Sequence, residues 1–348
     1  IDITLKMFSN SISFINKGKY ALNYLSVSQL RSFSVIFQGK ELPSVVSICE
    51  VGPRDGLQNE PKQIPTEVKV ELINKLKKSG LKNIEATSFV SPKWVPQLAD
   101  AADLLRHFEN DASVMYPVLT PNLKGFENAL KAKAKVVGVF PAASEAFSKK
   151  NLNCSIDESL KRFGEVMTAA KKEGVLVRGY VSCVVGCPYQ GVVEPKAAAD
   201  VAGALYEMGA YEVSMGDTIG VGTPASMTSM FQETMKQVPV KALAAHCHDT
   251  YGQALSNILA SLQLGIQSFD SSVAGLGGCP FARGATGNVA TEDLVYMLNG
   301  LGIQHGIDLD ALLDASIYIS GFLERPPESR AARALISKRN KKLGEEQK

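Results

Sequence analysis

The chain has 348 residues, of which 45% are hydrophobic and 21% are charged. This composition excludes a disordered, collagen-like or coiled-coil chain and leaves ample length for a hydrophobic core. The net charge is only +2, without a run of five Lys or Arg and without the roughly 18 apolar residues that span a membrane, so we expect neither a nucleic-acid nor a membrane partner.

The first forty residues differ in composition from the rest of the chain. Residues 3–40 hold five Lys or Arg, seven Ser and no Asp or Glu, which is typical of an organelle transit peptide. Arg31 also lies just upstream of a Ser-Phe-Ser sequence, as at a mitochondrial processing site. We therefore predict that residues 1–40 are a disordered transit peptide and that the protein acts in the mitochondrial matrix. A flexible N-terminus without targeting function is the alternative.

From residue 45 onward, short apolar or β-branched segments alternate with longer amphipathic ones. Eight such strand-and-helix units in an unbroken series predict an α/β fold, a (β/α)8 TIM barrel, over residues 41–305. No G-x-G-x-x-G follows the first strand, which argues against a dinucleotide-binding sheet. Residues 306–348 are predicted to form a short C-terminal helical extension. The expected strands are 45–51, 83–89, 113–120, 135–141, 176–184, 211–217, 242–248 and 268–274, and helices are expected at 66–79, 155–173 and 292–300.

Two histidines at the end of the seventh predicted strand give the sharpest sign of chemistry. His246 and His248 are two residues apart, so both side chains should face the barrel axis at the end where barrel active sites lie. Two imidazoles that converge suit a divalent metal, although polar residues can also end a strand without one. Strands 1, 7 and 8 are neighbours in a closed barrel, so Asp55 and a group after strand 8 can reach the same point. Oxygen and imidazole ligands favour Mg²⁺ or Mn²⁺ over Zn²⁺, and Asp249 is expected to cap a helix.

Three further residues have the chemistry of a catalytic pocket. Arg54 would bring a permanent cation to the metal site, where it can stabilise negative charge on a substrate oxygen. Glu85 could hold its guanidinium by paired hydrogen bonds, although such a pair is often only structural. Residues 275–287 include five glycines, which favours a mobile lid. Cys279 lies on this segment and is either a proton carrier or a small apolar loop residue.

Four segments of the chain resemble the 3-hydroxy-3-methylglutaryl-CoA lyase family. The resemblance runs from about residue 45 to residue 305, and the motifs are long and specific. They are 50–60 (EVGPRDGLQNE), 85–92 (EATSFVSP), 246–254 (HCHDTYGQA) and 271–288 (SSVAGLGGCPFARGATGN).

The resemblance implies a metal-dependent TIM barrel that splits hydroxymethylglutaryl-CoA into acetyl-CoA and acetoacetate. This retro-Claisen cleavage belongs to leucine degradation and ketone-body formation. The resemblance also implies a homodimer. The implied metal ligands are Asp55, His246, His248 and Asn288.

The resemblance further implies which residues act on the substrate. Arg54 polarises the thioester side, Glu85 supports the site, Cys279 takes part in proton transfer, and residues 149–153 lie near the CoA end. The expected catalytic residues are Arg54, Asp55, Glu85, Asp217 and Cys279. The expected substrate-binding residues are Arg54, Gln58, Lys150 and Asn151.

The chemistry fits these residues without the family name. Cleaving a carbon–carbon bond next to a tertiary alcohol needs a base for the hydroxyl proton and a cation for the departing enolate. A chelated metal lowers the pKa of the hydroxyl group. Arg54 would then face the thioester oxygen, and Cys279 would protonate the enolate carbon. The base is Asp55 or a water on the metal, and the sequence leaves both open.

Two functions of other classes compete with this hypothesis. Related barrels, the isopropylmalate and citramalate synthases, condense acetyl-CoA with a 2-oxo acid and share the acidic end of strand 1 and the H-x-H strand. The cysteine-bearing glycine-rich segment favours the lyase, as does the lack of a regulatory domain after the barrel. The second competitor is a scaffold or sensor that binds a metal or CoA without catalysis, which the competent residue types at every catalytic position disfavour.

Overall fold

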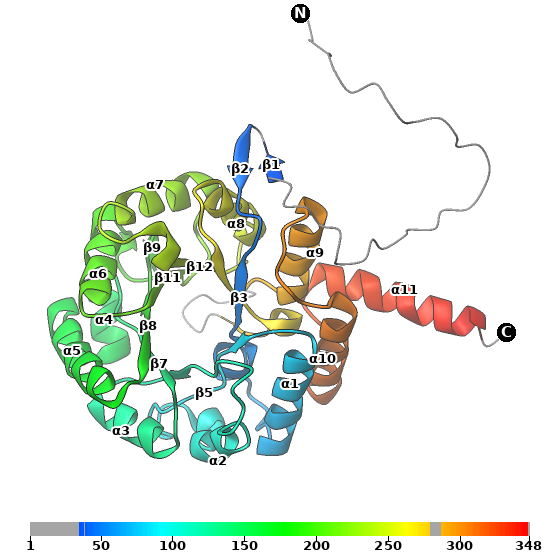
Figure 1. Ribbon diagram of the computed structural model, residues 1–348, viewed down its shortest axis with the longest axis horizontal. Helices are drawn as coiled ribbons and strands as arrows, with labels where there is room; N and C mark the ends of the chain where they lie inside the picture. The colour runs from blue at the N-terminus through cyan, green and yellow to red at the C-terminus, as the bar shows by residue number, and fades with distance from the viewer. Residues whose placement is uncertain (1–34, 38, 279–286, 347–348) are drawn as a thin grey trace, which may run out of the picture. The chain divides into compact units, whose positions relative to one another are not determined.

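The apolar segments after residue 45 pair as parallel strands, and the helices lie outside them (Figure 1). The computed structural model describes residues 35–37, 39–278 and 287–346. In order of pairing, the strands of this sheet are β4 (Asn83–Ile84), β3 (Ser47–Glu50), β13 (Ser268–Ser271), β12 (Leu243–Cys247), β11 (Glu212–Asp217), β8 (Leu176–Val181), β7 (Val136–Val139), β6 (Val118–Leu119) and β5 (Thr87–Ser88).

The two edge segments of this sheet, β4 and β5, belong to one stretch of chain, residues 83–88. Between them, Glu85 N–H donates to the carbonyl of Glu50 at 2.9 Å, and Ala86 N–H donates to the carbonyl of Pro117 at 3.0 Å. The stretch is therefore bonded to the first strand on one side and to the third strand on the other. The sheet is closed, and with residues 83–88 counted as one strand it is the predicted (β/α)8 barrel.

Every strand of the barrel lies within a segment predicted to be one, and most are shorter than predicted. The third strand is the most reduced: only β6 remains of 113–120, because Pro117 has no N–H to donate to a ladder. The predicted helix 155–173 is confirmed, since Ser155 and Glu158 form a reciprocal capping box at its start.

The helices pack their apolar faces on the outside of the sheet, and together they bury one hydrophobic core. None of the helices in the described ranges has the length and apolarity needed to cross a bilayer. The helices are α1 (Thr66–Lys78), α2 (Ala101–Arg106), α3 (Leu123–Lys131), α4 (Glu145–Leu152), α5 (Ile156–Glu173), α6 (Pro195–Glu207), α7 (Pro224–Thr234), α8 (Ala254–Gln263), α9 (Thr291–Leu301), α10 (Leu309–Phe322) and α11 (Arg330–Glu346). Shorter turns are η2 (Gly52–Gly56), η3 (Pro96–Leu98), η4 (Val240–Ala242) and η5 (Val273–Gly275).

The chain is helical after the barrel, as predicted, but its two helices differ in role. Helix α10 packs against α1 and α9 and buries Leu312, Ala315 and Ile319 in the barrel's own core. It is therefore part of the outer helical layer rather than a separate appendage. Helix α11 contacts α9 and is mostly exposed beyond that contact.

Two small hairpins lie outside the barrel sheet. The pair β9 (Gly186–Cys187) and β10 (Gly191–Val192) follows β8, and the pair β1 (Val35–Phe37) and β2 (Lys40–Leu42) precedes the barrel. The predicted disorder of residues 1–40 thus does not hold for β1, whose Val35 and Phe37 pack against the core. Residues 1–34 lie outside the described residues.

The buried carboxyl group of Glu50 joins the ends of the first and last barrel strands. Oε1 of Glu50 accepts the N–H groups of Gly52 and Val273, both at 2.8 Å, and Oε2 accepts the hydroxyl of Thr291 at 2.6 Å. These partners begin the segment after β3, the segment after β13 and helix α9. Burial raises the pKa of Glu50 to about 8, although these donors partly oppose the shift.

The Glu50→Gln variant should change how stability depends on pH. Because burial raises the pKa of Glu50 from 4.5 to about 8 on folding, its contribution to stability is full below the unfolded value and is lost as the pH rises through 8. The variant should therefore lose less stability between these pH values, by up to about 1.4 kcal/mol per pH unit. Urea unfolding at several pH values measures this, with Glu67→Gln at an exposed position as the control. Equal slopes in Glu50→Gln and the unaltered chain would contradict the assignment.

Candidate active site

A wide helical turn follows β3 and leads into the mouth of the barrel. Gly56 N–H donates to the carbonyl of Val51 at 3.2 Å, and Leu57 N–H donates to the carbonyl of Gly52 at 2.9 Å, so each bond spans five residues. Such π-type turns are rare and often occur at functional sites. A Cβ atom on Gly56 would lie 2.8 Å from Cβ of Leu276, so the turn needs glycine to approach the segment after strand 8.

The turn η2 places Asp55 beside the two histidines that end strand β12. One potential ligand atom each of Asp55, His246 and His248 lies within 4.8 Å of the others. The two imidazole rings have their centroids 5.2 Å apart. Asn288 lies between strand β13 and helix α9. Its side-chain nitrogen donates to Oδ2 of Asp55 at 2.8 Å. The structure thus brings together all four predicted metal ligands, because β3, β13 and β12 are neighbours in the sheet.

The donor set fits a divalent cation. Burial alone would raise the pKa of Asp55, but Arg54 and the two histidines lower it below its usual value, which favours the carboxylate. Burial lowers the pKa of His248 to about 4, which favours the neutral imidazole. The Nδ1 atom of His248 is buried and has no hydrogen-bond partner in the described part of the chain. Burial alone would lower the pKa of His246, but the hydrogen bond to Asp270 and the charges of Asp270 and Asp55 raise it, so a cation would have to displace a proton there. Carboxylate, imidazole and amide groups are the ligand types that Mn²⁺ or Mg²⁺ takes in proteins.

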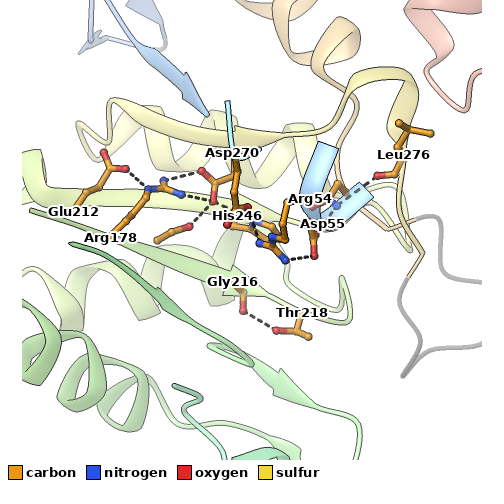
Figure 2. Close-up of polar contacts among 12 residues, drawn as sticks. Arg54, Asp55, Arg178, Glu212, Gly216, Thr218, His246, Asp270 and Leu276 are labelled. Atoms are coloured by element: carbon orange, nitrogen blue, oxygen red, sulfur yellow. Dashed lines mark hydrogen bonds and ion pairs between the residues drawn. The ribbon is translucent and has the colours of Figure 1, made fainter. Parts of the chain in front are cut away.

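Arg54 and Glu85 form the predicted ion pair, but through one contact rather than through paired hydrogen bonds. Nη1 of Arg54 lies 2.7 Å from Oδ1 of Asp55, and Nη2 lies 2.7 Å from Oε2 of Glu85 (Figure 2 shows the first of these contacts). Burial alone would lower the pKa of Arg54, but the two carboxylates raise it above its usual value. The guanidinium is therefore a fixed cation, and its buried Nε has no partner among the residues described.

Arg54, Asp55, His246 and His248 line a cavity of about 660 Å³. The predicted substrate-binding residues Gln58, Lys150 and Asn151 line the same cavity, and Gln58 donates to Oδ1 of Asp55 at 2.7 Å. Trp94 lines it too, with 81% of its surface exposed. A larger hollow of about 960 Å³ lies between α2 and α3, but it contains none of the potential metal ligands.

The structure does not bring Asp217 into this cluster. In the pairing of β11 with β12, Gly216 is opposite His246 and Asp217 is opposite Cys247. Because side chains alternate along a strand, Asp217 lies on the other face of the sheet from His246. Its carboxylate accepts backbone N–H groups four and five residues further along, at 3.1 and 2.8 Å, and burial raises its pKa to about 6. Asp217 thus shapes the loop after β11 and does not line the cavity.

Two other predicted residues have different outcomes. Cys279 lies outside the described residues, so its predicted role in proton transfer stays a prediction. The predicted capping role of Asp249 is confirmed, since its Oδ1 accepts the N–H of Ala254, the first residue of α8, at 3.0 Å.

A buried ion pair lies behind His246 and was not predicted from the sequence. Arg178 of β8 donates to both oxygens of Asp270 of β13, at 2.7 and 3.2 Å, and Asp270 Oδ2 lies 3.1 Å from Nδ1 of His246 (Figure 2). Both residues stand inside predicted strands, where a charged residue is rare unless it is paired. A charged residue inside a predicted strand could therefore have indicated a buried ion pair, but the sequence does not say which residue it pairs with.

Comparisons with known proteins agree with this geometry. The HMGL-like family model matches residues 45–319. A Bos taurus protein named hydroxymethylglutaryl-CoA lyase, mitochondrial, is 57% identical over 310 residues, which are 89% of this chain and 95% of that protein. The chain belongs to the hydroxymethylglutaryl-CoA lyase family. The resemblance found in the four motifs is therefore confirmed.

Other members of the lyase family match to a similar extent. A Mus musculus member named 3-hydroxy-3-methylglutaryl-CoA lyase, cytoplasmic, is 56% identical over 298 residues, which are 86% of this chain and 87% of that protein. The crystal structure of hydroxymethylglutaryl-CoA lyase from Pseudomonas aeruginosa is 56% identical, with a TM-score of 0.84 over 85% of this chain and 99% of that one. The lyase family is favoured over the condensing enzymes.

Removing one histidine should strongly weaken cation binding without unfolding the barrel. We expect His248→Ala to lower Mn²⁺ affinity by more than the roughly 10- to 100-fold that the loss of a supporting residue costs. The paramagnetic resonance signal of free Mn²⁺ measures this affinity. The control is His305→Ala, which removes a histidine that contacts Asn299 away from the cavity. Unchanged Mn²⁺ affinity in His248→Ala would show that the cluster is not the metal site.

Proposed function

We propose that this protein cleaves 3-hydroxy-3-methylglutaryl-CoA into acetyl-CoA and acetoacetate by a metal-assisted retro-Claisen reaction. The observation that carries this proposal is the convergence of Arg54, Asp55, His246 and His248 on one cavity in a chain of the lyase family. The cavity is large enough for the acyl group and the adjoining part of a CoA thioester, since small-ligand pockets span roughly 300–1,000 Å³.

The proposed cofactor is one divalent cation, Mg²⁺ or Mn²⁺, held by Asp55, His246, His248 and Asn288. Support comes from the clustered ligand atoms, from the buried imidazole of His248 with its lowered pKa, and from the absence of a thiol among the described residues of the cluster. When bound, the cation would polarise the substrate oxygens and lower the pKa of the hydroxyl group.

Each residue around the cation site has its own proposed role in the remaining steps of the reaction. Asp55 is the proposed base for the hydroxyl proton, because its neighbours keep it ionised. Arg54 is proposed to stabilise the negative charge that develops on the thioester oxygen as the enolate departs. Glu85 contacts Nη2 of the guanidinium, while Asp55 contacts Nη1. In this proposal the fixed positive charge of Arg54 lies next to the bond that breaks.

Gln58, Lys150 and Asn151 are proposed to bind the substrate, because all three line the cavity. Lys150 and Asn151 are carried by α4, an element that supplies none of the proposed metal ligands, which suits contacts with the CoA portion. Cys279 is proposed to protonate the enolate carbon. Asp217 is proposed to act from outside the cavity, by holding the loop after β11 in shape.

We also propose that the protein acts in the mitochondrial matrix. The support is the basic, serine-rich and acid-poor composition of residues 3–40 and the mitochondrial name of the bovine relative, although the family also has the cytoplasmic mouse member. A homodimer is proposed from the family resemblance alone.

Acetoacetate release from hydroxymethylglutaryl-CoA tests the proposed reaction. We expect release by the purified protein with Mg²⁺ or Mn²⁺, loss of release after EDTA, and recovery when the metal is returned. The same preparation should not release CoA from acetyl-CoA and a 2-oxo acid. Folded protein that condenses these substrates and does not cleave the lyase substrate would overturn the proposal.

The Arg54→Gln variant tests the role of the fixed cation. Because it removes charge stabilisation of the enolate, we expect kcat to fall by at least about 100-fold, while Mn²⁺ still binds. Steady-state kinetics and a Mn²⁺ titration measure the two properties, with Arg106→Gln at an exposed position as the control. Near-normal kcat in Arg54→Gln would rule out this role.

Intrinsic fluorescence should report CoA binding. Trp94 is the chain's sole tryptophan and lines the cavity while largely exposed. Because a bound CoA thioester would displace water from the indole, we expect a blue shift of the emission on titration with CoA. Free adenine at the same concentrations serves as the control for inner-filter effects. An emission spectrum unchanged at saturating CoA would place the CoA portion elsewhere.

A further inference from the structure

The two histidines of the proposed metal site are held in different ways. Nδ1 of His246 lies 3.1 Å from Oδ2 of Asp270. In contrast, Nδ1 of His248 is buried without a hydrogen-bond partner in the described ranges. Both rings line the same cavity. Of the two, only His246 is hydrogen-bonded to a carboxylate among the described residues.

The surroundings of Asp270 decide which nitrogen of His246 carries the proton. Asp270 is fully buried as a side chain and faces the guanidinium of Arg178, with Nη2 at 2.7 Å from Oδ1 and Nη1 at 3.2 Å from Oδ2. The hydroxyl of Ser214 also donates to Oδ2, at 2.7 Å. A carboxylate in such a position only accepts hydrogen bonds, so Nδ1 of His246 must be the donor. In the neutral imidazole, Nε2 is then unprotonated and available to a cation.

Arg178 is itself fixed on its remaining sides. Its Nε donates to Oε1 of Glu212 at 2.7 Å, and its guanidinium carbon lies 4.8 Å from the ring centroid of Tyr180. The side chain has no exposed surface, so its fork cannot swing away from Asp270. Figure 2 shows this row of side chains, from Glu212 through Arg178 and Asp270 to His246; they come from β11, β8, β13 and β12.

We propose that Arg178 and Asp270 are positioning residues that fix His246 in the Nδ1–H tautomer and so aim its Nε2 at the cation site. The inference rests on the proposed metal site and adds residues that touch neither substrate nor cation. Carboxylates that hold a ligating histidine in this way set both the tautomer and the ring orientation. The arginine is needed because a lone buried carboxylate would tend to take up a proton and could then no longer be an obligatory acceptor.

The Asp270→Asn variant changes the hydrogen bonding of this side chain while nearly keeping its size. The amide has nearly the same size as the carboxylate, but one of its two ends is a donor. Arg178 donates at its shorter contact, to Oδ1, so the amide oxygen should face Arg178 and the NH₂ group should face His246. That arrangement favours a proton on Nε2 of His246, which blocks the cation. We expect Mn²⁺ affinity to fall by about 10- to 100-fold.

Glu212→Gln is the matched control. It makes the same carboxylate-to-amide change on the same arginine, but Glu212 has no contact with His246 among the described interactions. We expect it to keep the Mn²⁺ affinity of the unaltered chain. Equal losses in Glu212→Gln and Asp270→Asn would overturn the proposal, because the effect would then come from disturbing the barrel interior in general.

Long-range ¹H–¹⁵N spectra of the four histidines read the tautomer directly. We expect Nδ1–H for His246 in the unaltered chain and Nε2–H in Asp270→Asn, with the signal assigned by its loss in His246→Gln. If Asp270→Asn fails to fold, an Nε2–H tautomer in the unaltered chain still overturns the proposal, and Nδ1–H supports it. If the unaltered chain binds no Mn²⁺, the proposed metal site fails. If it binds Mn²⁺ and Asp270→Asn binds equally well, only the positioning role fails.

Discussion

The parallel sheet closes at residues 83–88, and within it β3, β13 and β12 are neighbours. The proposed metal ligands come from the ends of these three strands and the segments that follow them. Asp55 leaves the end of the first strand, and Asn288, which contacts it, lies 233 residues further along the chain. Ladder hydrogen bonds fix the strands, and Glu50 then joins the two segments that leave them. The positions of the ligands are thus set by backbone pairing before any cation binds.

The interior of the barrel holds two rows of paired charges that meet at the site. In one, Arg54 lies between Asp55 and Glu85; in the other, Arg178 lies between Glu212 and Asp270. Burying such ions costs free energy that their attraction often does not recover, so they are weak evidence for stability. We propose that their geometry acts at the site instead. In this proposal Arg54 of the first row presents a fixed cation to the substrate, and the second row orients His246.

Much of the fold followed from the sequence because strand alternation and strand order depend on local pattern. We predicted in this way that His246 and His248 point to the same side, near Asp55, and the structure shows this arrangement. The orientation of Asp217 was not predictable, since it depends on where a six-residue strand ends relative to its loop. The pairing of Arg178 with Asp270 joins residues 92 apart, and no local pattern marks which buried charges meet. The packing of α10 on α1 likewise depends on the closed barrel.

Anomalous diffraction from crystals soaked in Mn²⁺ would test the central claim most directly, namely that Asp55, His246, His248 and Asn288 form one cation site at the cavity. The account predicts a single strong peak within coordination distance of a carboxylate oxygen of Asp55, Nε2 of His246 and an imidazole nitrogen of His248. A peak elsewhere, or none in crystals of protein that cleaves the substrate, would contradict it.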